Sequence, residues 1–184
     1  MTGRPFLPWP NKRLRTAAAP VDASTDEIRA IWADMVETME AMPGIGLAAP
    51  QVALPWRMFV AHVPVDPENP PPPPLTSVAT EEPTVYINPV LHYFSRDLEP
   101  YDEGCLSLPE IAGTGRRPSQ VSITATDLNG KRSTVRGAGL LARCWQHEMD
   151  HLEGTLIIDK FSPMDKRRAK RALKDLEAAA RPIA

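Results

Sequence analysis

The sequence contains little cysteine and no long apolar run. Its two cysteines, Cys105 and Cys144, are too few for a disulfide scaffold in 184 residues. No apolar run approaches the ~20 residues that a membrane-spanning helix needs. The N-terminal residues lack the apolar core of a signal peptide, and their prolines argue against an amphipathic transit helix. We therefore expect a cytoplasmic protein whose two thiols are reduced.

Net charge is also small. At −2, it gives no signal for binding to nucleic acid or to an anionic membrane. Hydrophobic residues make up 42% of the chain and charged residues 24%, which are ordinary values for a globular protein. Because 184 residues suit one hydrophobic core, we expect a single domain over residues 1–184. We expect no membrane and no sequence-specific nucleic acid as a partner.

Local patterns predict a helix in the first quarter of the chain. Ser24 and Glu27 form a capping-box pattern. Apolar residues then keep a helical period as far as Met42, and Pro43 and Gly44 follow as a stop signal. The helix is therefore expected between Ser24 and Met42.

Strand patterns follow this helix. β-branched and aromatic residues predict strands at 57–63 and 84–87. Alternating polar and apolar residues predict a strand at 121–126, joined by an Asn-Gly hairpin turn to another strand at 133–135. Residues 64–83 include five consecutive prolines, which predict a stiff surface loop.

A metal-binding pattern lies near the C-terminus. Residues 146–151 read QHEMDH, so on a helix His147 and His151 lie one turn apart on the same face. Two imidazoles at this spacing can bind one metal ion, and Glu148 can reach water beside it without being a ligand. The same pattern also arises by chance in unrelated chains. The helix itself is expected from Gly139 to a stop at Gly154.

These patterns together predict an α+β fold. Mostly antiparallel strands would pack around the central metal-binding helix. A C-terminal helix is expected from about Pro163 to Ala180, within a helical tail over residues 163–184.

A hydrolytic metal site needs a third protein ligand and an open position for water. Cys144 lies close in sequence, but Cys144, His147 and His151 would span about 10 Å of helix axis at ~1.5 Å per residue. Metal bonds of about 2.0–2.3 Å cannot bring three such donors together, so Cys144 is better explained as a small buried side chain. The third ligand should come from another segment. The remaining candidates are Cys105, His62, His92 and several carboxylates.

Two further segments have the composition of a substrate cleft. Gly104 precedes Cys105 and permits a kinked strand from which the sulfur can point into a cleft, and Pro109 is expected to end strand pairing soon after. A buried core thiol is the alternative. Residues 44–51 read GIGLAAPQ, and their small side chains leave room for a peptide backbone. Gln51 ends this segment with an amide donor of the type that stabilises an oxyanion.

The three segments together resemble the peptide deformylase family, whose members remove the formyl group from nascent chains that begin with formyl-methionine. The family carries G-x-G-x-A-A-x-Q, E-G-C-x-S and Q-H-E-x-D-H in this order. Residues 44–51, 103–107 and 146–151 match all three motifs without a substitution. The likeness extends from about residue 11 to residue 161. It implies a metal-dependent hydrolase whose substrates are N-formylmethionyl peptides.

The resemblance also implies a role for each motif residue. One divalent metal ion is expected, iron(II) first, with zinc, nickel or cobalt able to take its place. Its ligands would be Cys105, His147 and His151. The catalytic groups would be Glu148 for proton transfer, and the Gln51 side chain and Leu106 backbone N–H for the oxyanion. An extended peptide would pair with the segment that contains Gly44, Ile45, Gly46 and, across the cleft, Gly104.

The expected methionine pocket departs from the family pattern at one position. Its walls are predicted to include Ile45, Tyr86, Leu140 and Cys144. Arg143 stands four residues before His147, where many members have an apolar residue near the pocket. It could shrink the pocket, contact the peptide downstream of methionine, or extend to solvent. The loop at 64–83 is also longer than in compact bacterial members.

Charged residues around the motifs have two interpretations each. Glu103 and Asp150 could orient the metal-binding imidazoles or balance buried charge, or they could be solvated. The basic run at residues 166–171 lies on the final helix, and in this family a C-terminal helix can dock on the ribosome. A solvated helix face is the alternative. His62 and His92 lie outside the motifs and are expected to be ordinary surface or packing residues.

Four rival hypotheses remain at the level of sequence. The chain could be another H-E-x-x-H metallopeptidase, although zinc endopeptidases usually take histidine or carboxylate where Cys105 stands. It could be a deformylase-like protein with a narrower or different N-blocked peptide substrate. A non-enzymatic alternative is a ribosome-binding module, which the complete ligand set and Glu148 argue against. A structural metal site would require a fourth protein ligand.

Overall fold

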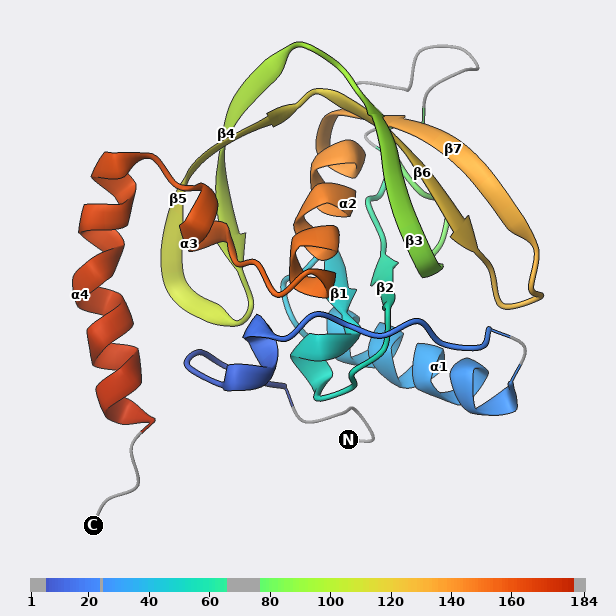
Figure 1. Ribbon diagram of the computed structural model, residues 1–184, viewed down its shortest axis with the longest axis horizontal. Coiled ribbons are helices and arrows are strands. Elements are labelled where there is room, and N and C mark those ends of the chain that lie inside the picture. The colour runs from blue at the N-terminus through green and yellow to red at the C-terminus, as the bar shows by residue number, and fades with distance from the viewer. Residues whose placement is uncertain (1–5, 24, 66–76, 181–184) are drawn as a thin grey trace.

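The computed structural model describes residues 6–23, 25–65 and 77–180 of the chain (Figure 1). Seven strands and four α-helices are described in these ranges. The strands are β1 (Gly46–Ala48), β2 (Met58–Ala61), β3 (Thr84–Phe94), β4 (Leu98–Cys105), β5 (Leu108–Pro118), β6 (Gln120–Thr126) and β7 (Arg132–Ala138). The helices are α1 (Asp26–Glu40), α2 (Gly139–Leu152), α3 (Ile157–Lys160) and α4 (Pro163–Ala179), with 3₁₀ turns η1 (Lys12–Arg15) and η2 (Ala49–Val52).

Five strands form an antiparallel sheet in the order β1-β2-β3-β6-β7. Successive side chains of β2 point to opposite faces of the sheet, and because all four are apolar and buried, both faces are apolar there. Phe59 and Ala61 belong to the cluster that contains Trp145 of α2, whereas Met58 and Val60 belong to the cluster that contains α1 residues. The sheet therefore lies between α2 and α1.

Strands β4 and β5 form a separate two-stranded antiparallel sheet on the other side of α2 (Figure 1). Its register shifts between Gly104 and Cys105, which pairs with Leu108. Such an irregularity bends a strand and changes where its side chains point. The register shift therefore lies at Cys105, which the sequence predicts to be a metal ligand.

Helix α4 stands at the side of the molecule and packs on β5 (Figure 1). The apolar cluster beneath it contains Ile111 of β5, Ile157 and Phe161 of the α3 segment, and Ala169 of α4. Gly113 of β5 permits this packing, because a Cβ there would lie 2.9 Å from the Phe161 ring. The tail helix is thus attached through its buried face, and its basic residues lie on the exposed one.

The predicted α+β fold is confirmed, including the central helix and the C-terminal helix. Helix α1 begins one residue later than predicted, because Thr25 is its N-cap and accepts a hydrogen bond from Ile28 N; Ser24 lies outside the described residues. The helix ends at Glu40 rather than near Met42. All four predicted strands are present, with β3 and β7 longer than expected.

The proline-rich loop is described only in part. Residues 66–76 lie outside the described ranges. The segment after them is held to the sheet, since Ser77 N donates to Arg136 O at 2.8 Å and Thr80 N donates to Val63 O at 2.8 Å. No helix in the described part of the chain combines the length and the apolar character needed to cross a membrane.

Candidate metal centre and active site

Three ligand-type side chains meet where β4 ends against the C-terminal half of α2. The ligand atoms of Cys105, His147 and His151 all lie within 4.8 Å of one another. Cys105 Sγ and His151 Nε2 are 3.2 Å apart. The two histidines come from successive turns of α2, with ring centroids 5.0 Å apart, and the cysteine comes from the irregular end of β4. The structure therefore brings together the three predicted ligands.

The donor set of this cluster fits a transition-metal ion. One sulfur and two imidazole nitrogens suit zinc or iron(II), and three protein donors leave a position open. Burial lowers the pKa of His151, which favours the neutral ring that a metal requires. Although burial also lowers the pKa of His147, hydrogen bonds to Cys105 and Glu103 raise it to about 10. The negatively charged groups around His147 that raise its pKa also favour a bound metal cation at this position.

Glu148 lies beside the cluster on the same helix and is buried. Its Oε2 atom has no hydrogen-bond partner among the described residues. Burial is the largest influence on its pKa and raises it to about 7, which suits a group that both accepts and returns a proton near neutral pH. A Cβ at Gly46 would lie 2.4 Å from Glu148 Oε1, so the carboxylate directly faces the backbone of β1.

Gln51 reaches the cluster from the 3₁₀ turn η2. Its Oε1 accepts from Ala48 N at 2.9 Å, which fixes the amide orientation. Its Nε2 then lies 3.8 Å from Cys105 Sγ and 3.2 Å from Ser107 Oγ. Leu106 lies in the turn between β4 and β5, and its side chain lies where a Cβ on Gly44 would come within 2.9 Å. The Gln51 amide therefore borders the cluster, and both Gln51 and Leu106 line the same cavity as Cys105 and His147.

A cavity of about 810 Å³ opens over these groups. Among its lining residues are the four predicted substrate-binding positions Gly44, Ile45, Gly46 and Gly104. In the described part of the chain, β1 is an edge strand of its sheet and pairs with β2 alone. Its other edge can accept an extended peptide by strand addition.

The pocket walls are partly as predicted. Leu140, Cys144 and Ile45 line the cavity. Burial raises the pKa of Cys144 well above its usual range, and its thiol donates to Ile45 O at 3.4 Å, so Cys144 is a packed thiol. The prediction for Tyr86 is wrong: this residue is buried and stacks on Phe59 at 4.7 Å between ring centroids, inside the core.

A buried charge network supports the cluster from behind. Glu103 accepts from Arg117 Nε at 2.7 Å and Nη2 at 2.8 Å, from Arg143 Nη1 at 2.7 Å, and lies 3.3 Å from His147 Nδ1. Although burial raises the pKa of Glu103, the His147 and Arg117 contacts hold it well below its usual range. Arg117 also donates to Asp150 Oδ2 at 2.8 Å. Glu103 and Asp150 are therefore paired within the protein.

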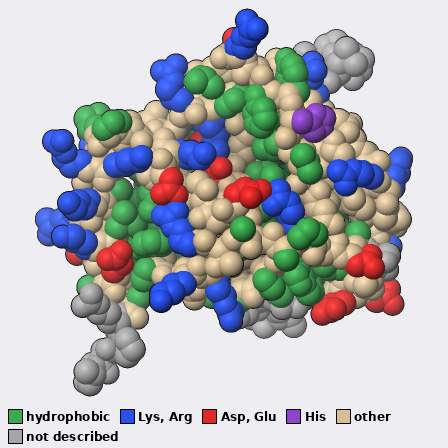
Figure 2. All heavy atoms as spheres, in the orientation of Figure 1, with side chains coloured by type: hydrophobic (Ala, Val, Ile, Leu, Met, Phe, Trp, Pro, Cys, Tyr) green, Lys and Arg blue, Asp and Glu red, His purple; other side chains and the backbone are tan. Residues whose placement is uncertain are grey.

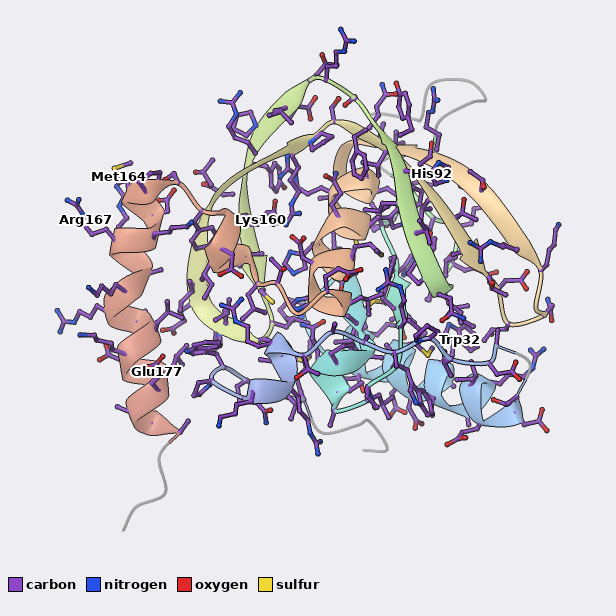
Figure 3. The ribbon with its side chains drawn as sticks, in the orientation of Figure 1. Trp32, His92, Lys160, Met164, Arg167 and Glu177 are labelled. Atoms are coloured by element: carbon purple, nitrogen blue, oxygen red, sulfur yellow. The ribbon has the colours of Figure 1, made fainter. Side chains whose placement is uncertain are left out.

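Sequence reasoning missed Arg117. Its partners Glu103 and Asp150 are 14 and 33 residues away along the chain, so no local pattern marks it. The other two histidines, His62 and His92, are not part of the metal cluster. His92 is exposed on β3, and its Nε2 lies 2.7 Å from Thr124 Oγ1 (Figure 3).

Comparison with known proteins gives this geometry a family. The family model of polypeptide deformylases matches residues 4–167. The chain belongs to the peptide deformylase family. A peptide deformylase of Acinetobacter baumannii is 45% identical over 166 residues, which cover 90% of this chain and 87% of the relative. One of Bradyrhizobium diazoefficiens is 41% identical over 181 residues, covering 98% of each.

Solved deformylase structures have the same fold. The crystal structure of a peptide deformylase from Ehrlichia chaffeensis matches with a TM-score of 0.87 at 33% identity, covering 96% of this chain and 98% of that one. A structure of the Ehrlichia chaffeensis enzyme in complex with actinonin matches with a TM-score of 0.86 at 32% identity, covering 98% and 99%. Membership of the deformylase family implies one catalytic metal, and the structure contains a Cys-His-His cluster of the kind that could hold it.

Proposed function

We propose that this deformylase-family enzyme hydrolyses N-formylmethionyl peptides of nascent chains with the cluster of Cys105, His147 and His151 as the ligands of its one metal ion. The observation that carries the proposal is that Cys105, His147 and Glu148 line one cavity, with the ligand atom of His151 within 4.8 Å of those of Cys105 and His147. The overall reaction adds water across the formyl C–N bond and releases formate and a free amino terminus. Neither a general metallopeptidase nor a ribosome-binding module without activity is supported by the comparisons.

Proton transfer is assigned to Glu148. A bound divalent metal supplies Lewis-acid chemistry, polarising a carbonyl and making water more acidic. Glu148 takes a proton from the attacking water as the C–O bond forms. It then gives that proton to the peptide nitrogen as the formyl C–N bond breaks. A carboxylate with a pKa raised to about 7 can act in both directions near neutral pH.

The oxyanion is assigned to two donors from residues that line the cavity, Gln51 and Leu106. The Gln51 amide is held by Ala48 N and Ser107 Oγ, so it is oriented before substrate arrives. The backbone N–H of Leu106 would be the second donor, from the turn that follows Cys105. Fixed donors of this kind stabilise the negative charge that develops on the formyl oxygen.

The substrate backbone is assigned to the free edge of β1. Gly44, Ile45 and Gly46 would pair with an extended peptide, and Gly104 would face it across the cavity. Among the described residues, no atom outside its immediate neighbours lies within 4 Å of a Cβ built on Gly104, so this side of the cavity has room for a main chain. The first side chain would enter between Ile45, Leu140 and Cys144.

Iron(II) is the metal that we assign to the centre. A thiolate adds both softness and negative charge to two imidazoles, and this donor set suits iron(II) as well as zinc. Metal analysis of protein purified without oxygen, beside protein purified in air, tests the assignment. Iron in the anaerobic preparation and its replacement by zinc with loss of turnover in air would agree with it.

A contact with the ribosome is assigned to α4. Its basic residues Lys166, Arg167, Arg168, Lys170, Arg171 and Lys174 are all exposed. Blue side chains gather along this side of the molecule in Figure 2, and Arg167 points away from the body in Figure 3. Co-sedimentation with ribosomes should weaken when salt rises, and it should be lost when Arg167, Arg168 and Arg171 are all changed to Gln.

Hydrolysis of formyl-Met-Ala-Ser by iron(II)-loaded protein tests the central proposal. Its acetylated and unblocked analogues serve as controls. Formate released from the formyl peptide alone is the expected result. Cys105→Ala should lose both metal and activity, whereas Cys144→Ala should keep the metal. Full activity in Cys105→Ala would sink the ligand assignment.

A further inference from the structure

Arg143 is a buried arginine in the wall of the substrate cavity. It is 7% exposed and lines the same cavity as Gly46, Cys105 and Glu148. Arg143 lies on α2 four residues before His147, about 6 Å along the helix axis at ~1.5 Å per residue. A side chain of the substrate's first residue that runs from the metal cluster along α2 therefore arrives at Arg143.

The guanidinium of Arg143 is fixed from behind. Nη1 donates to Glu103 Oε1 at 2.7 Å, and Nη2 donates to Glu99 O at 2.8 Å. Its Cζ lies 5.0 Å from the centroid of the Tyr101 ring, a cation–π contact. The two hydrogen bonds and the cation–π contact together hold the planar guanidinium in one orientation. An arginine without such partners would be free to change rotamer.

Part of the guanidinium remains available to a ligand. Arginine has five N–H donors, of which Nη1 and Nη2 each donate one to the protein. Nε has no hydrogen-bond partner among the described residues, yet it is not one of the fully enclosed unpartnered atoms. The Nε–H therefore borders accessible space, and Arg143 lines the cavity. The wall thus has a free hydrogen-bond donor close to the apolar side chains of Leu140 and Cys144.

We propose that Arg143 lets this pocket take a first side chain that carries a hydrogen-bond acceptor, so that the enzyme also deformylates peptides beginning with formyl-methionine sulfoxide. This inference rests on the proposed function. In a wholly apolar pocket the sulfoxide oxygen would be buried without a partner, and a pocket built that way rejects it. Here the free Nε–H of Arg143 can donate to that oxygen. Norleucine has a similar shape without an acceptor and gains nothing from this donor.

Steady-state kinetics with three formyl peptides test the proposal. Formyl-methionyl, formyl-norleucyl and formyl-methionine-sulfoxide forms of the same Ala-Ser peptide are compared in wild type and Arg143→Leu. The ratio of kcat/KM for the sulfoxide to that for norleucine is expected to fall about tenfold in Arg143→Leu, mainly through KM. Arg116→Leu is the matched control, because Arg116 is exposed and does not line the cavity. An unchanged ratio in Arg143→Leu would overturn the proposal.

A second measurement needs no variant. The unformylated methionine-sulfoxide peptide is tested as a competitive inhibitor of wild type beside its methionine and norleucine counterparts. Inhibition constants for the sulfoxide and methionine peptides within about tenfold of each other are expected. Sulfoxide inhibition weaker by more than a hundredfold would overturn the inference, even if Arg143→Leu does not fold. Absence of formate from the formyl-methionyl peptide would instead count against the proposed function itself.

Discussion

The five-stranded sheet and the β4–β5 sheet are attached to α2 by different forces. On one side, Phe59, Ile123 and Trp145 belong to one apolar cluster. Gly137 lets the indole approach, because a Cβ there would lie 2.4 Å from Trp145 Cζ3. On the other side, Glu103 is held to the arginines of β5 and α2 by ion pairs of 2.7 Å. One face of the helix is thus packed and the other is charged.

The two sides of α2 differ because the apolar side packs against the sheet, whereas the charged side orients a metal-binding histidine. Apolar packing is non-directional and tolerates volume-conserving change. Charged hydrogen bonds fix angles, and Glu103 lies 3.3 Å from His147 Nδ1, so it can orient the imidazole. Breaking such a network from one side leaves the partner charge buried, which costs more than the pair contributes. The catalytic side of α2 is therefore the more specific and the more fragile side.

The largest effect is expected at the carboxylate that faces the cavity. Glu148→Gln keeps the shape of the side chain but cannot accept the proton, so kcat should fall about 10²–10⁴-fold. Metal content and the melting temperature should stay close to those of wild type, because Glu148 is not assigned as a ligand. Activity assays and metal analysis of the same preparation check both parts. A variant that lost its metal would mean that Glu148 belongs to the coordination sphere.

The next effect separates the two sides of α2 directly. Glu103→Gln should lower the free energy of unfolding by about 3–5 kcal/mol, since Arg117 and Arg143 lose their buried counter-charge. Metal affinity should fall about 10–100-fold, because His147 loses its orienting contact. Phe59→Leu is the matched change on the apolar side, and it should cost about 1 kcal/mol without altering metal affinity. Urea titrations and competition with a chelator measure the two quantities, and equal metal affinity in both variants would remove the distinction.

The same contrast explains how far the sequence could predict the structure. Four strands of the five-stranded sheet carry their own β-branched or alternating pattern, so β2, β3, β6 and β7 were predicted. The short β1, with the sequence GLA, has no such pattern and was not predicted as a strand. The β4–β5 hairpin was not, because β4 is mostly exposed and its pattern is polar. Pro109 was expected to end strand pairing, yet it is the second residue of β5. The register passes from the pair Cys105 and Leu108 to the pair Gly104 and Ala112, so Pro109 has no partner in β4 and its missing N–H removes no ladder hydrogen bond.

The candidate site was easier to predict than the sheet that supports it. H-E-x-x-H spacing is set by helix geometry alone, and so His147, Glu148 and His151 follow from local sequence. Cys105 became a ligand candidate through its motif, and the fold brings it to His151. Arg117 could not be predicted, because its role depends on contacts between β5, β4 and α2. Local patterns thus identify the reacting groups, whereas long-range charge pairs decide how they are oriented.

A smaller effect is expected where backbone atoms line the cavity. Gly46→Ala places a methyl group 2.4 Å from Glu148 Oε1 and 2.9 Å from Cys144 Sγ, so the carboxylate must shift and kcat/KM should fall about tenfold. Gly104→Ala meets no protein atom outside its neighbours within 4 Å, so stability should be unchanged. If the peptide lies against Gly104, however, KM should rise in this variant alone. Kinetic constants for formyl-Met-Ala-Ser distinguish the two, and an unchanged KM in Gly104→Ala would place the peptide elsewhere.

The smallest effect concerns the attachment of α4, which combines apolar and polar contacts. Asp165 accepts from Ser162 Oγ at 2.6 Å and from Thr114 N of β5 at 3.3 Å, and these bonds lower its pKa. A folded-state pKa below the unfolded value of about 4 stabilises the fold above that pH, and the stabilisation is lost as pH falls through the folded value. Asp165→Asn should therefore be less stable than wild type at pH 7, with a difference that shrinks towards pH 3. Urea titrations across this range test it beside Asp175→Asn, whose exposed pair with Arg171 at 4.0 Å should matter little. A difference independent of pH would show that Asp165 acts through packing, as the apolar side of α2 does, and not through its charge.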